Sequence, residues 1–159
     1  MPTPLPALLE EQLRRSFEGP AWHGPSVSEA LDGVTASDAA SRPIPNAHSI
    51  WELVLHLSGT YGLVLRRMRG DTAPLSLADD WPAIPDTSES AWAAAREELR
   101  AINARIRKEV LEFPEDRLDE QLIPNPTYTA FTQFIGITQH DLYHAGQIVL
   151  LKKAIARNA

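Results

Sequence analysis

The sequence contains no cysteine among its 159 residues. This absence excludes disulfide bonds, thiolate nucleophiles and thiolate metal ligands. The chain also lacks an apolar run long enough to span a bilayer, and its first residues do not show the basic and then apolar pattern of a signal peptide. We therefore expect a cytoplasmic protein that makes no membrane contact.

Positive charge is scarce as well. Fifteen Lys and Arg residues against 21 Asp and Glu residues give a formal net charge of -6. Proteins that bind nucleic acid usually carry a basic patch or stripe, so we expect no nucleic-acid partner. A glycine-rich phosphate loop and a GxSxG nucleophile elbow are also missing, which argues against the enzyme classes that depend on them.

Helical periodicity is the strongest feature that is present. Apolar residues recur at spacings of three and four in four stretches, and no stretch alternates convincingly as a strand would. The pattern and the length predict an all-α protein, a four-helix bundle forming one domain over residues 1–159. The expected core stripes are Leu5, Leu8, Leu9, Leu13 and Phe17; Ile50, Leu53, Val54, Leu57, Tyr61 and Val64; Trp92, Ala95, Leu99, Ile102, Ile106, Val110 and Phe113; and Phe134, Ile137, Ile148 and Leu151.

Local signals predict where these helices begin and end. The first ends at Gly19-Pro20, and a long connector over 21–45 contains one or two short helical turns. The second begins near Asn46, a favourable N-cap residue, and ends near Gly70. The third opens with Asp86 and Glu89 at capping-box spacing and ends at Pro114, and the fourth runs from about Thr129 to Ala156. Four glycines lie inside the second and fourth helices: Gly59, Gly62, Gly136 and Gly146. They favour close helix packing, and the alternative is that they leave open space for a substrate.

Two of the five histidines stand out. His140 and His144 are one helical turn apart and share the direction of Ile137 and Ile148, so both rings point into the bundle. Two imidazoles at this spacing can bind one metal ion. The alternative is a pair of core histidines that hydrogen-bond to Gln147, Thr138 or a backbone carbonyl, because buried imidazoles need partners.

His56, on the flank of the second stripe, is the natural third ligand. His48 lies eight residues earlier, about 80° away around the helix, so it cannot face the same point as His56. His23 lies in the first connector and is expected to pack on Trp22.

Few other residues are expected to lie beside the three histidines. Tyr143 and Gln147 flank the histidine pair. Asp141 is rotated about 100° from His140 and is expected to face solvent or to support the ligands from outside. Glu52 shares a face with His48 and His56 but is expected to be a surface residue. We assign no general base.

Three segments resemble the DinB-like superfamily, which includes the YfiT-like metal-dependent hydrolases. They are HSIWELVLHL at 48–57, HDLYHAGQI at 140–148 and AWHGPS at 21–26, and the second is the most specific. The resemblance implies an up-down-down-up bundle, often a homodimer. It also implies a three-histidine metal site, which is carried over onto His56, His140 and His144. Some members of the superfamily use low-molecular-weight thiols such as bacillithiol or mycothiol.

Three histidines leave a divalent ion with an open coordination position, as in catalytic sites. Zinc is the expected ion, followed by nickel. The function we expect is a metal-dependent hydrolase or thiol-dependent transferase acting on a small molecule. The alternatives are a non-enzymatic metal-binding stress or interaction protein and a bundle with buried histidines and no metal. Trp22 or Trp81 is expected near the site, and Trp92 in the core.

Overall fold

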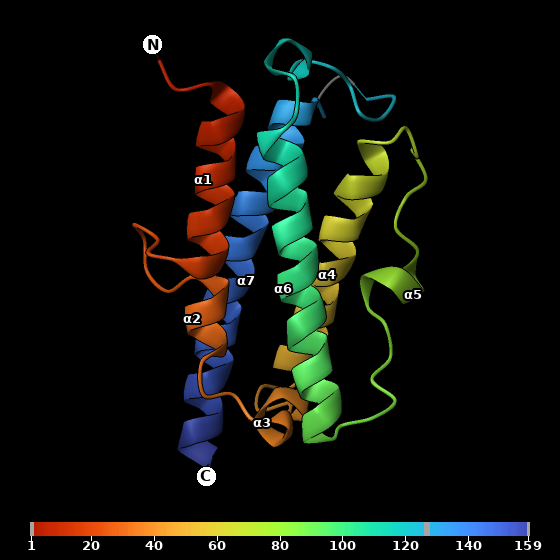
Figure 1. Ribbon diagram of the computed structural model, residues 1–159. Coiled ribbons are helices and arrows are strands. Elements are labelled where there is room, and N and C mark those ends of the chain that lie inside the picture. Colours follow the sequence, from red (N-terminus) through yellow and green to blue (C-terminus); the bar gives the residue numbers. More distant parts are fainter. Residues whose placement is uncertain (1, 126–127, 159) are drawn as a thin grey trace.

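The computed structural model describes residues 2–125 and 128–158, and four long helices dominate it. They are α1 (Leu5–Glu18), α4 (Ile50–Arg67), α6 (Glu89–Leu111) and α7 (Ala130–Asn158). Figure 1 shows α1 and α7 running in one direction and α4 and α6 in the other. This is the up-down-down-up bundle that the sequence resemblance implies. Among the described helices, none has the length and apolar composition to cross a membrane.

Short helices occupy the connectors. The first connector holds α2 (Val27–Leu31) and α3 (Ala36–Ala40), the second holds α5 (Leu77–Asp80), and the third holds a 3-10 turn, η1 (Glu115–Arg117). Hydroxyl side chains begin the three α-helical pieces: Ser26, Thr35 and Ser76 each accept a hydrogen bond from a backbone N–H in the first turn. Such caps satisfy donors that a helix start leaves free, which allows even a short helix to form.

The predicted core is largely confirmed. All six residues of the α4 stripe are buried, as are the four α7 residues. Three residues of the predicted stripes need correction: Leu8 is 48% exposed, and Leu5 and Ile102 are only partly buried. Leu8 and Leu9 are neighbours, so their directions on the helix differ by about 100°. Only Leu9 reaches the centre of the face that α1 packs against the bundle.

Two predicted helix starts are wrong. Ser49 caps α4, and its hydroxyl and the Glu52 carboxylate satisfy each other's backbone N–H groups in a capping box. Asn46 instead has a φ of 62° and lies outside the helix. Ser88 caps α6, while Asp86 accepts hydrogen bonds from the N–H and the hydroxyl of Ser88 and lies outside the helix. In each case a residue closer to the first apolar position satisfies more of the free donors.

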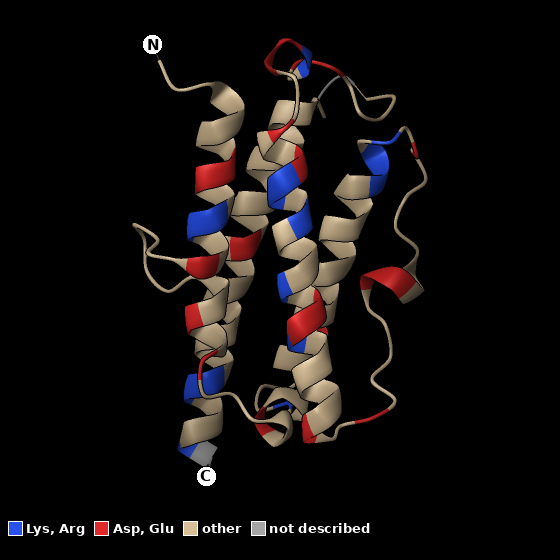
Figure 2. Ribbon diagram, viewed as in Figure 1, with Lys and Arg blue, Asp and Glu red and all other residues tan. Residues whose placement is uncertain are grey.

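Charged residues of both signs are interspersed along α1 and α6 (Figure 2). Helix α7 differs, because Asp141 is its one charged residue between Ala130 and Leu151. Most of α7 is thus apolar, with the histidine pair set in its inward face.

One glycine determines how the second connector docks. A Cβ atom placed on Gly59 would lie 2.7 Å from the carbonyl oxygen of Asp79, so only glycine lets α5 lie this close to α4. Gly62 is in ordinary contact range of Ile102, at 3.6 Å. The packing interpretation is wrong for Gly136 and Gly146: apart from the two chain neighbours and the adjacent backbone of α7 itself, no heavy atom of the described chain lies within 4 Å of the added Cβ.

Candidate metal centre

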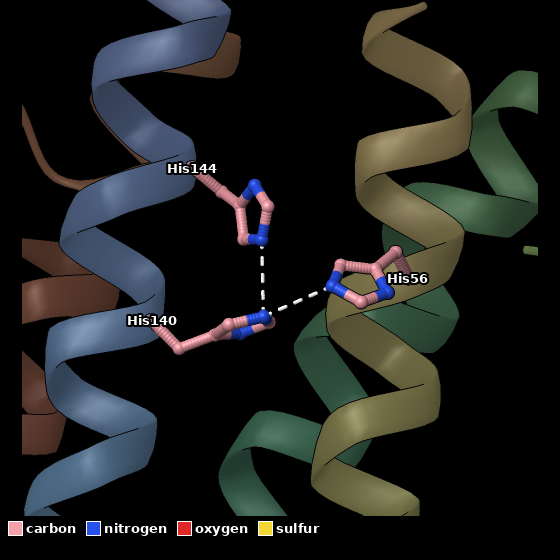
Figure 3. A group of neighbouring side chains, drawn as sticks. All are labelled: His56, His140 and His144. Atoms are coloured by element: carbon pink, nitrogen blue, oxygen red, sulfur yellow. Dashed lines mark hydrogen bonds between the residues drawn. The ribbon is translucent and has the colours of Figure 1, made fainter. Parts of the chain in front are cut away.

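The side chains of His56, His140 and His144 meet between α4 and α7 (Figure 3). The Nε2 atom of His140 lies 3.0 Å from Nε2 of His56 and 3.0 Å from Nε2 of His144. The ligand atoms of all three lie within 4.8 Å of one another. The structure therefore brings together the three residues singled out by the sequence.

Helix geometry explains why these rings converge. His140 and His144 lie one turn apart on the side of α7 that also carries the buried Ile137 and Ile148. His56 lies on α4 between the buried Leu53 and Leu57, and its side chain is 12% exposed. Packing of the two apolar faces thus draws the imidazoles into one small volume.

Two of the rings are fixed from outside by acceptor oxygens. Nδ1 of His56 lies 2.8 Å from Oδ1 of Asp80 and 3.1 Å from the Asp80 carbonyl oxygen. Nδ1 of His144 lies 2.7 Å from Oε1 of Gln147. Since a carboxylate or carbonyl oxygen only accepts, Nδ1 carries the hydrogen in both rings. The Nε2 lone pairs of His56 and His144 therefore both face the centre.

His140 alone cannot provide a hydrogen bond to both of these lone pairs. Its single Nε2–H could donate fully to only one of the two facing lone pairs, and its buried Nδ1 has no hydrogen-bond partner among the described residues. A cation at the centre accepts three lone pairs at once. With Zn–N distances of about 2.0–2.1 Å, tetrahedral geometry separates the nitrogens by roughly 3.3 Å, close to the separation seen here. The donor set fits a divalent ion.

Burial also favours the neutral form of the His140 and His144 rings, which coordination requires. The pKa of His140 is lowered from 6.5 to about 3, first by burial and then by the neighbouring His144 and His56 rings. Burial lowers the pKa of His144 too, against the hydrogen bond to Gln147, which raises it. At neutral pH both nitrogens are available as ligands.

Trp81 covers the outer side of His56. Its ring stacks on His56 at a centroid distance of 4.1 Å and on His48 at 3.5 Å, so it lies between the two imidazoles. His48 is therefore separated from the three-histidine cluster, as expected. Of the two tryptophans considered for this position, Trp81 is the one found beside the cluster. Trp92 is buried in the core and donates to the Val34 carbonyl.

Other expectations need correction. Trp22 is fully exposed, so His23 does not pack on it. Asp141 does not face solvent or support the histidines: it is fully buried and accepts hydrogen bonds from Ser16 Oγ at 2.8 Å and Tyr61 OH at 2.5 Å. Its direction, about 100° from His140, points to α1 and the inner face of α4. Burial raises the pKa of Asp141 to about 7, although both hydrogen bonds lower it.

The remaining neighbours have mixed roles. Gln147 supports His144, as the sequence suggested. Tyr143 is 65% exposed and touches the site only through its ring, 5.0 Å from that of His144. Glu52 caps α4 and pairs with Arg42, and its carboxylate is 3.7 Å from His48.

Asp80 is the residue that the sequence did not reveal. The available signal was weak: two consecutive acidic residues after a serine cap, beside a tryptophan. Nothing local indicated that this connector folds back onto the second helix.

Comparison with known proteins agrees with the geometry. No curated protein and no solved structure matches the chain. The family model of the DinB superfamily matches residues 9–148, which includes all three histidines, the whole of α4 and the part of α7 that carries His140 and His144. The chain therefore belongs to the DinB superfamily.

Proposed function

We propose that this protein binds one divalent metal ion through His56, His140 and His144 and uses it in a reaction of a small molecule, as a hydrolase or a low-molecular-weight-thiol transferase. The observation that carries the proposal is the convergence of three imidazoles, in which Nε2 of His140 lies 3.0 Å from Nε2 of both His56 and His144 and all three ligand atoms lie within 4.8 Å of one another. Two of the rings already present lone pairs to the centre because their Nδ1 atoms are engaged.

The chain's own residues divide into two groups. Three imidazoles would hold the ion, while Asp80 and Gln147 fix the orientation and protonation of two of them. When bound, such an ion retains positive charge and an open position, which supplies Lewis-acid chemistry toward a water, a thiolate or a carbonyl group. Imidazole ligands suit zinc best on usage, with nickel as the second candidate.

The metal site is tested by zinc titration calorimetry on protein purified without nickel resin and stripped with a chelator. We expect one zinc per chain. His140→Ala and the double variant His140→Ala/His144→Ala should lose this binding, whereas His23→Ala, which removes an exposed imidazole, should keep it. Unchanged binding of one zinc by the double variant would refute the site.

The reaction is tested next on the zinc-loaded protein. A screen should place bacillithiol, mycothiol and glutathione beside ester and amide substrates. Turnover that requires a thiol would identify a transferase, and turnover in water alone a hydrolase. Loss of that turnover in His56→Ala would tie it to the cluster. Turnover retained without zinc would overturn the proposed function.

A further inference from the structure

A cavity of about 300 Å³ adjoins the histidine cluster. Its walls come from the segment before α4, from α4 itself and from the C-terminal half of α7. Five of its eight lining residues are apolar: Ile44, Ala47, Leu53, Leu150 and Leu151. The volume is at the lower end of the range for small-molecule sites, and the mainly apolar lining is typical of them.

Two polar lining residues connect this cavity with the metal centre. Gln147 lines it and also holds Nδ1 of His144 through Oε1. His48 lines it and stacks on Trp81, which in turn stacks on His56. Gln147 thus contacts the expected ligand His144 directly, whereas Trp81 separates His48 from the expected ligand His56.

The hydrogen-bonding state of Gln147 defines what the polar end of a ligand must offer. Its oxygen is occupied by His144, which leaves the Nε2 amide group as a donor. No residue of the described chain accepts a hydrogen bond from that group. A ligand atom placed beside Gln147 should therefore be an acceptor, such as a carbonyl oxygen.

The rest of the lining defines the other end of the ligand. None of the described lining residues is Asp, Glu, Lys or Arg. A charged group moved into an apolar cavity without a partner loses its hydration at a high cost. The binding of an uncharged aliphatic chain is instead favourable, because it removes apolar surface of the chain and of the cavity from water.

We propose that this cavity binds the apolar chain of a neutral carbonyl compound, an aliphatic amide or ester, whose carbonyl oxygen accepts a hydrogen bond from Gln147 Nε2. That the bound compound is a substrate of the metal centre rests on the proposed function. The inference gives that function a substrate class. It disfavours charged thiol compounds as occupants of this cavity.

The binding test uses butanamide, hexanamide and octanamide, which need no metal to bind. Protein NMR titrations on the full chain, metal-free and zinc-loaded, should show the Kd falling about fourfold for each added methylene until the cavity is filled. The monoamide of adipic acid, which matches hexanamide but ends in a carboxylate, should bind at least tenfold more weakly than hexanamide. A Kd independent of chain length, or equal binding of the charged monoamide, would overturn the proposal.

Variants locate the binding. Ala47→Leu reduces the volume of the cavity, and Leu150→Ser removes a lining leucine that is 61% exposed. Both variants should bind octanamide several-fold more weakly. Leu111→Ser is the matched control, because it changes a 51% exposed leucine at the end of α6, outside this cavity. Equal affinity of all three variants would refute the assignment.

Failure of this inference can be told apart from failure of the metal site. Zinc binding without chain-length-dependent amide binding would overturn the cavity assignment and leave the metal site standing. Chain-length-dependent amide binding by a protein that takes up no zinc would support the cavity and overturn the metal site.

Discussion

The Asp80 carboxylate lies 2.8 Å from Nδ1 of His56, and the carbonyl oxygen of the same aspartate lies 3.1 Å from that nitrogen. A residue of a connector thus holds a ring that projects from α4 toward α7 (Figure 3). The contact exists because Gly59 lets α5 approach α4 closely. The geometry of the metal centre therefore depends on a segment outside the four long helices.

Removing the Asp80 side chain should weaken zinc binding. Carboxylates that orient a ligating histidine are typically worth about 10–100-fold in metal affinity, so we expect a loss in this range for Asp80→Ala. Asp80→Asn keeps an acceptor oxygen and should lose less. Calorimetry measures both, with Asp116→Ala as the control that removes one negative charge from η1. Equal affinities of Asp80→Ala and Asp116→Ala would show that Asp80 does not position the ring.

Gly59→Ala should weaken the metal site without stabilising the fold. Alanine favours a helix interior by about 0.5–1 kcal/mol, but its methyl group would lie 2.7 Å from the Asp79 carbonyl oxygen and must displace α5. We expect weaker zinc binding together with little or no gain in Tm.

Gly136→Ala is the matched comparison, because the added carbon would meet no heavy atom of another described element within 4 Å. It should raise the stability by about 0.5–1 kcal/mol and leave zinc affinity unchanged. Calorimetry and thermal melts followed by circular dichroism distinguish the two variants. Identical behaviour of the pair would show that the docking of α5 is irrelevant to the metal centre.

The ligand set could be predicted from sequence because it depends on local helical geometry. A spacing of four residues places His140 and His144 side by side, and the apolar residues around them show which way they face. The same reasoning located the core of α4. Asp80 could not be found this way, since its position depends on where a connector docks, and that is set by contacts distant in sequence.

Two other features that the sequence analysis did not predict are the start of α4, which has a recognisable signal in the sequence, and the burial of Asp141, which has only a partial one. Ser49 and Glu52 have the spacing of a capping box, which is a stronger start signal than the lone Asn46. The rotation of about 100° from His140 turns Asp141 away from the histidine cluster, but that angle alone does not tell whether the side chain meets solvent or α1. That direction leads to Ser16 and Tyr61, whose hydroxyls can satisfy a buried carboxyl group.

Asp141 should make the metal-free protein less stable as pH rises. The folded-state pKa of about 7 exceeds the ordinary value of 3.8, so the folded protein holds a proton between these values that the unfolded chain has lost. Asp141→Asn lacks this dependence. Relative to wild type, the variant should gain more than about 1 kcal/mol between pH 5 and pH 8, whatever its constant offset. Urea unfolding at several pH values measures this difference, and a difference that does not vary with pH would contradict the raised pKa.

His140 should make the metal-free protein less stable as pH falls. Its pKa of about 3 in the folded state lies below the ordinary 6.5, so the unfolded chain binds more protons as pH falls through 6.5, and the metal-free fold loses stability. Above pH 6.5 the effect vanishes. Wild type should therefore lose about 1–2 kcal/mol relative to His140→Ala between pH 7 and pH 5, allowing for solvent screening of this partly exposed ring. The same urea series, run with a chelator present, tests this, and parallel curves for the two proteins would rule it out.

Trp81 should report metal binding directly. Its ring stacks 4.1 Å from the His56 ring, so a paramagnetic ion held by that imidazole lies close enough to quench its fluorescence. Adding Co²⁺ or Cu²⁺ to the stripped protein should quench the emission in a saturable way, with a midpoint that matches the calorimetric affinity. Trp81→Phe should abolish most of the quenching, because the aromatic stack remains while the nearest fluorophore is lost. Trp22→Phe is the control, since Trp22 is fully exposed on the loop after α1 and should contribute little to the saturable change. Quenching that survives Trp81→Phe and disappears with Trp22→Phe would place the ion away from the three histidines.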